Sequence, residues 1–119
     1  MKRFRVPDRG DVYLLNPNPQ AGHEIKDNHR FIVITPKGIN KLGVSMTVPV
    51  TSGGEFSRLH GLTVPIKGHD TSGVAICNQI RFFDIEARVK QGTAKYIETI
   101  DTHIASAIVN RVLSVIDPA

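Results

Sequence analysis

The sequence has a single cysteine, Cys77, and no tryptophan. One cysteine cannot form an internal disulfide, which argues against a secreted, disulfide-stapled scaffold. No stretch approaches the roughly 18 apolar residues that a membrane-spanning helix needs. The apolar run near the N-terminus is short and is interrupted by Pro7, Asp8, Arg9 and Asp11, unlike a signal sequence. We therefore expect a cytoplasmic protein without a membrane partner.

Acidic residues are fewer than basic ones, with 11 Asp and Glu against 15 Lys and Arg, which gives a net charge of +4. This balance favours a polyanionic partner through long-range attraction but does not identify it. At 119 residues the chain has the size of one domain, and 40% hydrophobic residues argue against disorder. We expect a single domain over residues 1–119.

Short runs rich in Val, Ile and Thr dominate the first two thirds of the chain and are separated by turn formers. These runs predict strands at 11–15, 31–35, 44–50, 62–66 and 73–80. Pro49 and Pro65 fall inside two of them and should lie at edges, bulges or bends, because proline cannot donate to a ladder. A small, strongly curved barrel would accommodate both prolines. Between residues 81 and 98 the pattern is ambiguous, with 84–88 compatible with a short helix and 94–98 with a strand.

The C-terminal segment has a different pattern. Apolar residues recur there at helical spacing, namely Ile104, Ile108, Val112, Val115 and Ile116. Asp101 is a suitable N-cap, and Pro118 follows the expected end. One amphipathic helix is predicted to close the chain.

The connection "GHEIKDNHR" at 22–30 concentrates titratable groups between two apolar runs. His23, Glu24, His29 and Arg30 could supply the proton-transfer groups and cations that work on a phosphodiester requires. A solvated surface loop is the plainer alternative. A metal site on His23, Glu24 and His29 would be a third reading, but their spacing matches neither HExxH nor a zinc pattern. We expect no metal and no cofactor.

Two further stretches carry candidate contacts. Thr51 and Ser52 in "VPVTSGG" precede a double glycine, where hydroxyls and amides could converge on an anion, although a simple turn fits as well. Asn78 and Gln79 lie in the strand-like run "VAICNQI", where adjacent residues point to opposite faces and an amide could read a base edge. Alternatively, these amides satisfy neighbouring backbone groups. Cys77 in the same run is expected to be a small buried hydrophobe rather than a nucleophile.

The stretches "RGDVYLLNPNPQAGHE", "VPVTSGGEFSR" and "GVAICNQIRFFDIEAR" together resemble the MazF/PemK/Kid family of toxin endoribonucleases from type II toxin–antitoxin systems. "AGHE", "PVTSGGEF" and "NQIRFFDIEAR" are most similar to the PemK and ChpB branch. The resemblance implies a small, SH3-like (CcdB/MazF-type) bent β-barrel with a C-terminal helix, which agrees with the pattern of strands followed by one helix. It also implies a homodimer with an RNA groove across both subunits.

The resemblance further implies metal-independent cleavage of single-stranded mRNA, leaving a 2′,3′-cyclic phosphate and a 5′-hydroxyl. His23 and Glu24 match the family's "GHE" loop, Arg30 its loop arginine, and Thr51 with Ser52 its strand-end hydroxyl pair. The chain departs from Kid-like members, which have "RCDQ" where this chain has "ICNQ". A base and an acid assigned to those flanking positions therefore cannot be transferred.

The remaining roles follow from side-chain chemistry. His23, with a reference pKa near 6.5, suits proton shuttling, and Glu24 could act as base if its pKa is raised. Arg30 stays charged and suits stabilisation of the phosphorane. Thr51 is expected to act beside these three, and Ser52 to orient the phosphate. Further RNA contacts are expected from His29, Asn78, Gln79 and Arg81.

The implied partners are single-stranded RNA and a cognate antitoxin with an acidic, partly disordered segment, with DNA reached only indirectly through the antitoxin. The main alternative is a non-catalytic CcdB-like toxin that binds DNA gyrase, because fold alone does not fix function. An SH3-like interaction module ranks last, since its groove normally needs several aromatics and this chain has two Tyr, five Phe and no Trp.

Overall fold

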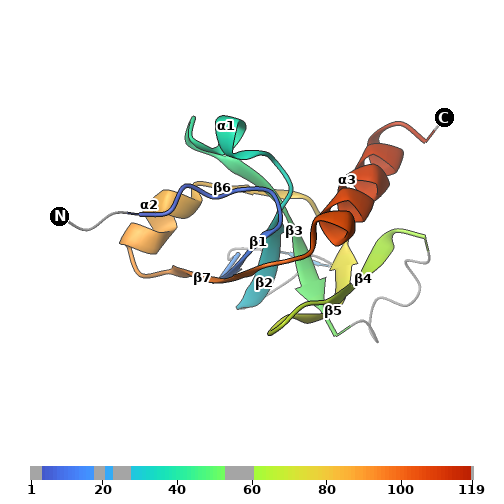
Figure 1. The fold of residues 1–119 in the computed structure, drawn as a ribbon, viewed down its shortest axis with the longest axis horizontal. Coiled ribbons are helices and arrows are strands. Elements are labelled where there is room, and N and C mark those ends of the chain that lie inside the picture. Colours follow the sequence, from blue (N-terminus) through green and yellow to red (C-terminus); the bar gives the residue numbers. More distant parts are fainter. Residues whose placement is uncertain (1–3, 18–20, 23–27, 53–60, 119) are drawn as a thin grey trace.

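The computed structural model describes residues 4–17, 21–22, 28–52 and 61–118. In these residues the chain forms seven strands and three helices around one sheet (Figure 1). The strands are β1 (Asp11–Leu15), β2 (His29–Val33), β3 (Ser45–Thr51), β4 (Thr63–Lys67), β5 (Ser72–Ile76), β6 (Arg81–Phe83) and β7 (Ala94–Thr99). The helices are α1 (Lys37–Asn40), α2 (Ile85–Lys90) and α3 (Thr102–Ile116). A bilayer-spanning helix needs about 20 mostly apolar residues, and no helix in the described part of the chain meets that requirement.

The strands run antiparallel in the order β4-β5-β3-β2-β1-β7, and β6 pairs with β3 beside this path. The mainly β architecture with a C-terminal helix agrees with the prediction. The word barrel needs correction, because among the described strands β4 and β7 are two separate ends of the path and do not pair. The sheet is open.

Strand β3 explains how the two prolines are accommodated. Its first half pairs with β6 through Thr47, and its second half pairs with β5 from Val50 onward. Pro49 lies where β3 changes from one partner to the other, so its missing N–H removes no bond on that side. Pro65 lies in β4, the first strand of the path and therefore an edge strand. Both positions match the expectation.

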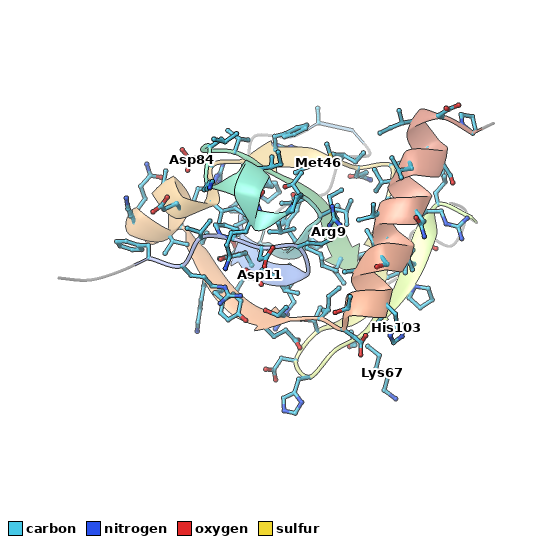
Figure 2. The ribbon with its side chains drawn as sticks, turned by 45° about the horizontal axis from the view of Figure 1, so that its top comes forward. Arg9, Asp11, Met46, Lys67, Asp84 and His103 are labelled. Carbon is cyan, nitrogen blue, oxygen red and sulfur yellow. The ribbon has the colours of Figure 1, made fainter. Side chains whose placement is uncertain are left out.

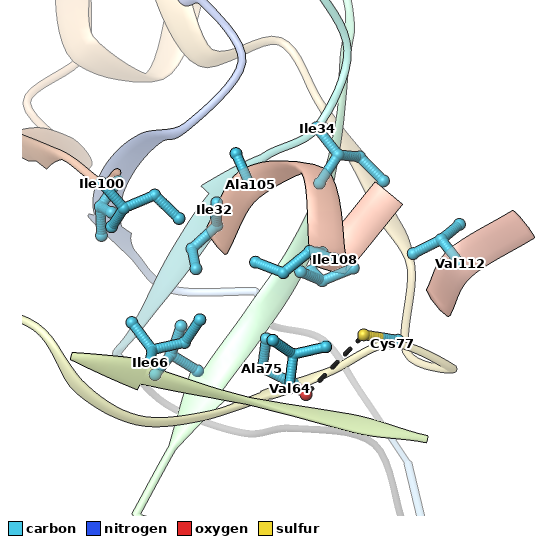
Figure 3. Packing of buried hydrophobic residues seen from close by; sticks show 13 residues of the cluster. Ile32, Ile34, Val64, Ile66, Ala75, Cys77, Ile100, Ala105, Ile108 and Val112 are labelled. Carbon is cyan, nitrogen blue, oxygen red and sulfur yellow. Dashed lines mark hydrogen bonds between the residues drawn. The ribbon is translucent and has the colours of Figure 1, made fainter. Parts of the chain in front are cut away.

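Helix α3 begins after the predicted N-cap, because the Asp101 carboxylate accepts a hydrogen bond from the His103 amide at 3.0 Å. Its buried residues Ala105, Ile108 and Val112 pack on one face of the sheet (Figure 3). That core also contains the thiol of Cys77, which is fully buried and therefore confirms the expected packing role. Burial raises the pKa of Cys77 to about 11. The predicted apolar stripe ends short of Ile116, which is 65% exposed.

The opposite face of the sheet has a second core built around aromatic rings. Phe31 and Phe83 meet edge to face with ring centroids 5.1 Å apart, and Tyr13 and Leu15 pack in the same cluster. Helix α2 adds Ile85 to it and begins at Asp84, whose carboxylate accepts from the Ala87 amide at 3.0 Å (Figure 2). Each fully buried side chain of this size contributes about 1.5–3 kcal/mol relative to exposure. Both faces of the sheet are thus fixed by apolar packing.

Two local predictions were wrong. Strand β5 ends at Ile76 instead of continuing to residue 80, and the Gln79 amide turns back to the Ile76 carbonyl at 3.2 Å. Asn78 and Gln79 therefore lie in a turn and not on opposite faces of a strand. The turn is needed because the chain must leave β5 and return to β3 as β6. Helix α1, inside the expected separator 36–43, was not predicted because four residues carry little helical periodicity.

Asp11 is a buried carboxylate that ties the N-terminal segment to the sheet. Its side chain is fully buried and accepts two hydrogen bonds from the Arg5 guanidinium, both at 2.9 Å. It also accepts from the Asp8 amide at 2.9 Å and from the Thr99 hydroxyl at 2.8 Å. Figure 2 labels Asp11 near the middle of the molecule. With all these donors the carboxylate is compensated for its burial.

Glu98 on β7 holds the tip of the hairpin between β4 and β5. Its carboxylate accepts from the amides of His69 and Asp70, each at 2.8 Å. Gly68 leaves room for this contact, because a Cβ there would lie 2.8 Å from a Glu98 oxygen. Burial opposes ionisation, but the Thr71 hydroxyl and the two amides outweigh it and lower the pKa of Glu98. The hairpin tip is therefore fixed by a charged group.

Glu98→Gln tests this attachment through the pH dependence of stability. A carboxyl with a lowered folded-state pKa stabilises above its unfolded value of about 4.5, and this contribution is lost as pH falls through the lower folded value. We expect the variant to lose about 1 kcal/mol of unfolding free energy at pH 7 and much less near pH 3, by urea denaturation. Glu86→Gln, which removes an exposed carboxylate paired with Lys90, is the control. Parallel pH profiles of wild type and Glu98→Gln would contradict the attachment.

Candidate active site

A cleft of about 310 Å³ opens where β1, β2, β3 and β5 come together at one end of the sheet. Among the described residues, its lining combines one guanidinium, one imidazole, three hydroxyls, one amide and two apolar side chains, without a carboxylate. The lining residues are Leu14, Asn28, His29, Arg30, Val50, Thr51, Ser52 and Ser72. Four of the predicted site residues, His29, Arg30, Thr51 and Ser52, are therefore brought together. The arrangement is suited to an anion.

Arg30 owes its position to the register of the sheet. It pairs with Leu14 of β1 and Val50 of β3, so these three side chains share a face. Ile32, two residues on, lies on the same face and is buried in the core packed by α3. Arg30 thus extends an apolar row to the end of the sheet, where that row meets the cleft.

The Arg30 side chain has one polar atom without a partner in the described part of the chain. Its Nε is buried and has no hydrogen-bond partner among the described residues. A buried donor without a partner costs about 1–3 kcal/mol. Arg30 is also one of the residues that line the cleft. A guanidinium fork matches the oxygens of a phosphate.

The hydroxyl side of the cleft is built by a close approach of β5 to β3. Thr51 pairs with Val74, and Ser72 at the start of β5 joins Thr51 and Ser52 in the lining. Gly73 makes this approach feasible, because a Cβ there would lie 2.1 Å from the Thr51 carbonyl oxygen, and its φ of 131° favours glycine. The "TSG" at 71–73 is thus a structural requirement of the cleft.

Gly73→Ala should therefore disrupt the cleft from its backbone. The added methyl cannot fit without moving β5 away from Thr51, and we expect a loss of about 2–3 kcal/mol of unfolding free energy in thermal or urea denaturation. Gly38→Ala in α1 is the matched control, because nothing lies within 4 Å of its Cβ position. An unchanged unfolding midpoint for Gly73→Ala would show that the close approach is not required.

The structure does not assign the other predicted residues to this cleft. His23 and Glu24 fall outside the described residues, so their roles stay predictions. Asn78 and Gln79 lie in the turn after β5 and are not among the residues that line the cleft. Their expected contact with RNA also stays a prediction.

Arg81 is used to hold the chain that leaves β1. Its guanidinium donates to the Pro17 carbonyl at 3.2 Å and lies 5.3 Å from the centre of the Phe83 ring. Arg88 does the same from α2, donating to the Asn16 carbonyl at 3.0 Å and lying 4.7 Å from that ring. These two arginines fix the start of the connection that contains His23 and Glu24. The structure gives Arg81 this positioning contact; the expected contact with RNA is untested.

The cleft also contains groups that sequence reasoning missed, namely Leu14, Asn28 and Ser72. Asn28 lies in the stretch "GHEIKDNHR", two residues before Arg30. This closeness in the sequence could have identified it as a candidate. Ser72 lies 20 residues beyond Ser52, and only the antiparallel pairing of β3 with β5 brings the two together. Within the described residues no group of three His, Cys, Asp or Glu side chains could hold a metal ion.

Comparison with known proteins agrees with this fold. Residues 8–116 match the family model described as PemK-like, MazF-like toxin of type II toxin–antitoxin system. Endoribonuclease PemK of Escherichia coli is 35% identical over 103 residues, which cover 84% of this chain and 77% of that protein. Endoribonuclease toxin ChpB of Escherichia coli K12 is 36% identical over 85 residues, covering 69% of this chain and 73% of ChpB.

Solved structures show the same fold. MazF from Deinococcus radiodurans superposes with a TM-score of 0.79 at 26% identity, covering 95% of this chain and 98% of that one. A chain of the MazE-MazF crystal structure from the same organism gives 0.75 at 25% identity, covering 98% and 100%. The family model and the solved structures thus match nearly the whole length, and the two relatives match 84% and 69% of it. The chain belongs to the PemK-like, MazF-like toxins of type II toxin–antitoxin systems.

Proposed function

We propose that the protein is a toxin endoribonuclease that cleaves single-stranded RNA, mRNA in particular, at a short sequence without a metal ion, and thereby arrests translation and growth. One observation carries the proposal: Arg30, whose buried Nε has no partner within the described part of the chain, lines a cleft with three hydroxyls, and no carboxylate is among the described lining residues. Relatives named endoribonucleases support the same activity. The net charge of +4 favours a polyanionic substrate.

The proposed reaction is an attack of the ribose 2′-oxygen on the adjacent phosphorus. A base takes the 2′-OH proton, the bond from phosphorus to the 5′-oxygen breaks, and an acid protonates that oxygen. The products are a 2′,3′-cyclic phosphate and a 5′-hydroxyl. Arg30 stabilises the charge of the phosphorane, because it stays a cation throughout. Thr51, Ser52 and Ser72 orient the phosphate oxygens.

Proton transfer needs a base and an acid besides Arg30. We assign it to His23 and Glu24, in the same connection as His29 and Arg30. His29 lines the cleft and contacts the RNA. The "ICNQ" sequence at 76–79 supports this assignment. Ile76, which is fully buried, has no group that could gain or lose a proton. The base and the acid must therefore come from outside that stretch.

The same cleft is the proposed binding place of an antitoxin segment. Type II systems pair a toxin with an antitoxin, and the solved MazE-MazF structure is named for such a pair. An acidic, partly disordered segment would complement Arg30 and the basic surface and would exclude RNA by occupying its site. We place the protein in the cytoplasm, where mRNA and antitoxin are made.

A homodimer is supported by exposed apolar side chains at the opposite end of the sheet. Ile39, Leu42 and Val44 are 48%, 78% and 48% exposed, and Phe82 is 60% exposed. Phe82 pairs with Met46, two residues from Val44, so Val44 and Phe82 share a face. Contiguous apolar surface of this kind marks an interaction site. We assign it to the second copy, and Phe82→Ser should shift the sedimentation coefficient toward that of a monomer.

The function is tested by incubating the protein, in EDTA, with a long unstructured RNA and with DNA of the same sequence. We expect cuts only in RNA and at one short motif. The new 5′ ends should accept phosphate directly from a polynucleotide kinase, as 5′-hydroxyls do. Intact RNA would refute the proposal, and growth arrest with intact mRNA would favour the gyrase-binding alternative.

A further inference from the structure

A second cleft lies beside the first. Its volume is about 270 Å³, and it shares Leu14 and Asn28 with the first cleft. Its other lining residues are Asn16, Gly92, Thr93, Ala94 and Lys95. The two clefts therefore meet along Leu14 and Asn28, and they form a path across the end of the sheet.

The register of the sheet places a cation in each cleft. Leu14 of β1 pairs with Arg30 of β2 on one side and with Lys95 of β7 on the other. Directly paired residues point to the same face, so Lys95, Leu14 and Arg30 form one row. Neighbouring strands lie about 4.8 Å apart, which puts the backbones of Lys95 and Arg30 roughly 10 Å from each other. Strands β7, β1 and β2 can be followed side by side in Figure 1.

The chemistry of the second cleft fits one nucleotide. Lys95 is exposed and can meet a phosphate as a point charge. Leu14 offers an apolar surface between the two cations on which a base can pack. The side-chain amides of Asn16 and Asn28 offer both donors and acceptors to base edges.

The walls of the second cleft are held in place. The carbonyl of Asn16 is fixed by the Arg88 guanidinium at 3.0 Å, and the Thr93 hydroxyl donates to the Arg88 carbonyl at 3.2 Å. Gly92 has a φ of 79° and no atom within 4 Å of its Cβ position, so the turn presents open backbone there. Both walls thus depend on Arg88, which is itself packed on Phe83.

We propose that the second cleft binds the nucleotide next to the scissile one, with Lys95 on the phosphate that follows the scissile phosphate along the path. This inference rests on the proposed ribonuclease function and adds a specificity-determining subsite to it. Arg30 meets the reacting phosphate, while Lys95 meets a phosphate that does not react. Lys95 therefore acts on substrate affinity, and any choice of sequence in this subsite comes from the groups that meet the base.

The test scans a cleavable RNA oligonucleotide with single methylphosphonates, each of which removes one phosphate charge. In the wild type, the methylphosphonate one position from the cut should lower kcat/KM by about two- to fivefold, the upper part of the range of one exposed charge contact. In Lys95→Ala this particular sensitivity should vanish while the other positions keep theirs. Lys95→Ala should also raise KM with little change in kcat, and lower the salt slope of binding by about 0.7.

The structure also provides a control variant, Lys41→Ala, and two outcomes would contradict the proposals. Lys41→Ala removes an equal charge from the residue that follows α1, which does not line either cleft, and should keep the full wild-type pattern. If Lys95→Ala keeps every methylphosphonate sensitivity while the wild type cleaves RNA, the subsite is refuted and the ribonuclease stands. If the wild type neither cleaves RNA nor binds an oligonucleotide with a 2′-deoxy cleavage site, the proposed function itself fails.

Discussion

Arg30→Ala should lower the rate of RNA cleavage by about 10²- to 10³-fold, the usual effect of removing one preorganised charge stabiliser. The same substitution should leave the unfolding midpoint unchanged or slightly higher. The reason is that the Nε of Arg30 is buried without a partner in the described structure, so its removal relieves an unpaid desolvation cost. Single-turnover cleavage and thermal denaturation of the same preparation measure the two effects.

Two variants sharpen this prediction. Arg30→Lys keeps the charge but loses the planar fork, and its rate should fall between those of wild type and alanine. Arg111→Ala removes the same charge from the exposed side of α3, away from the cleft lining, and should cleave normally. Equal losses in Arg30→Ala and Arg111→Ala would mean that overall charge, and not the cleft, governs cleavage.

Asp11→Ala should remove about 2–4 kcal/mol of unfolding free energy, a large part of the 5–15 kcal/mol typical of a domain. Four hydrogen bonds end on this fully buried carboxylate, and three donor groups, Arg5, Asp8 and Thr99, lose their acceptor together. Urea denaturation followed by circular dichroism gives the difference directly.

Asp11→Asn and Arg5→Ala separate the effect of the Asp11 charge on stability from the effect of its side-chain size. The asparagine keeps the size of the side chain but turns an amide toward groups that donate, so it should be nearly as destabilising as alanine. Arg5→Ala should cost less, because the Arg5 side chain is 48% exposed and two donors to Asp11 remain. An Arg5→Ala variant less stable than Asp11→Ala would contradict this account.

Much of the fold could be predicted because local patterns agreed with tertiary packing. The α3 stripe of Ile104, Ile108 and Val112, with Asp101 as cap, was readable from helical spacing alone. The strands were readable from Val- and Ile-rich runs, with ends displaced by one or two residues except at the end of β5, which stops four residues early. The turn at Asn78 was not readable, because it is set by β3 exchanging β6 for β5, and both partners are distant in sequence.

The residues of the candidate site also differ in whether local sequence patterns could predict them. Arg30, Thr51 and Ser52 were found through motifs, and the cleft brings them together. Ser72, Lys95 and the Glu98 attachment were not found, because each depends on strand pairing across 20 or more residues. Gly73 is the clearest case, since the reason for a glycine there is the carbonyl of Thr51 and nothing in its own neighbourhood in the sequence.

The reactivity of the buried Cys77 thiol can report how often the native protein opens around α3. A thiol with no exposed surface and a pKa of about 11 reacts with a disulfide reagent only while α3 and its core residues are separated from the sheet. The labelling rate at Cys77 therefore measures how often that face opens in the native state. A ligand bound in the cleft should slow the labelling only if the opening that exposes Cys77 also disrupts the cleft, so the comparison shows whether the two regions open together.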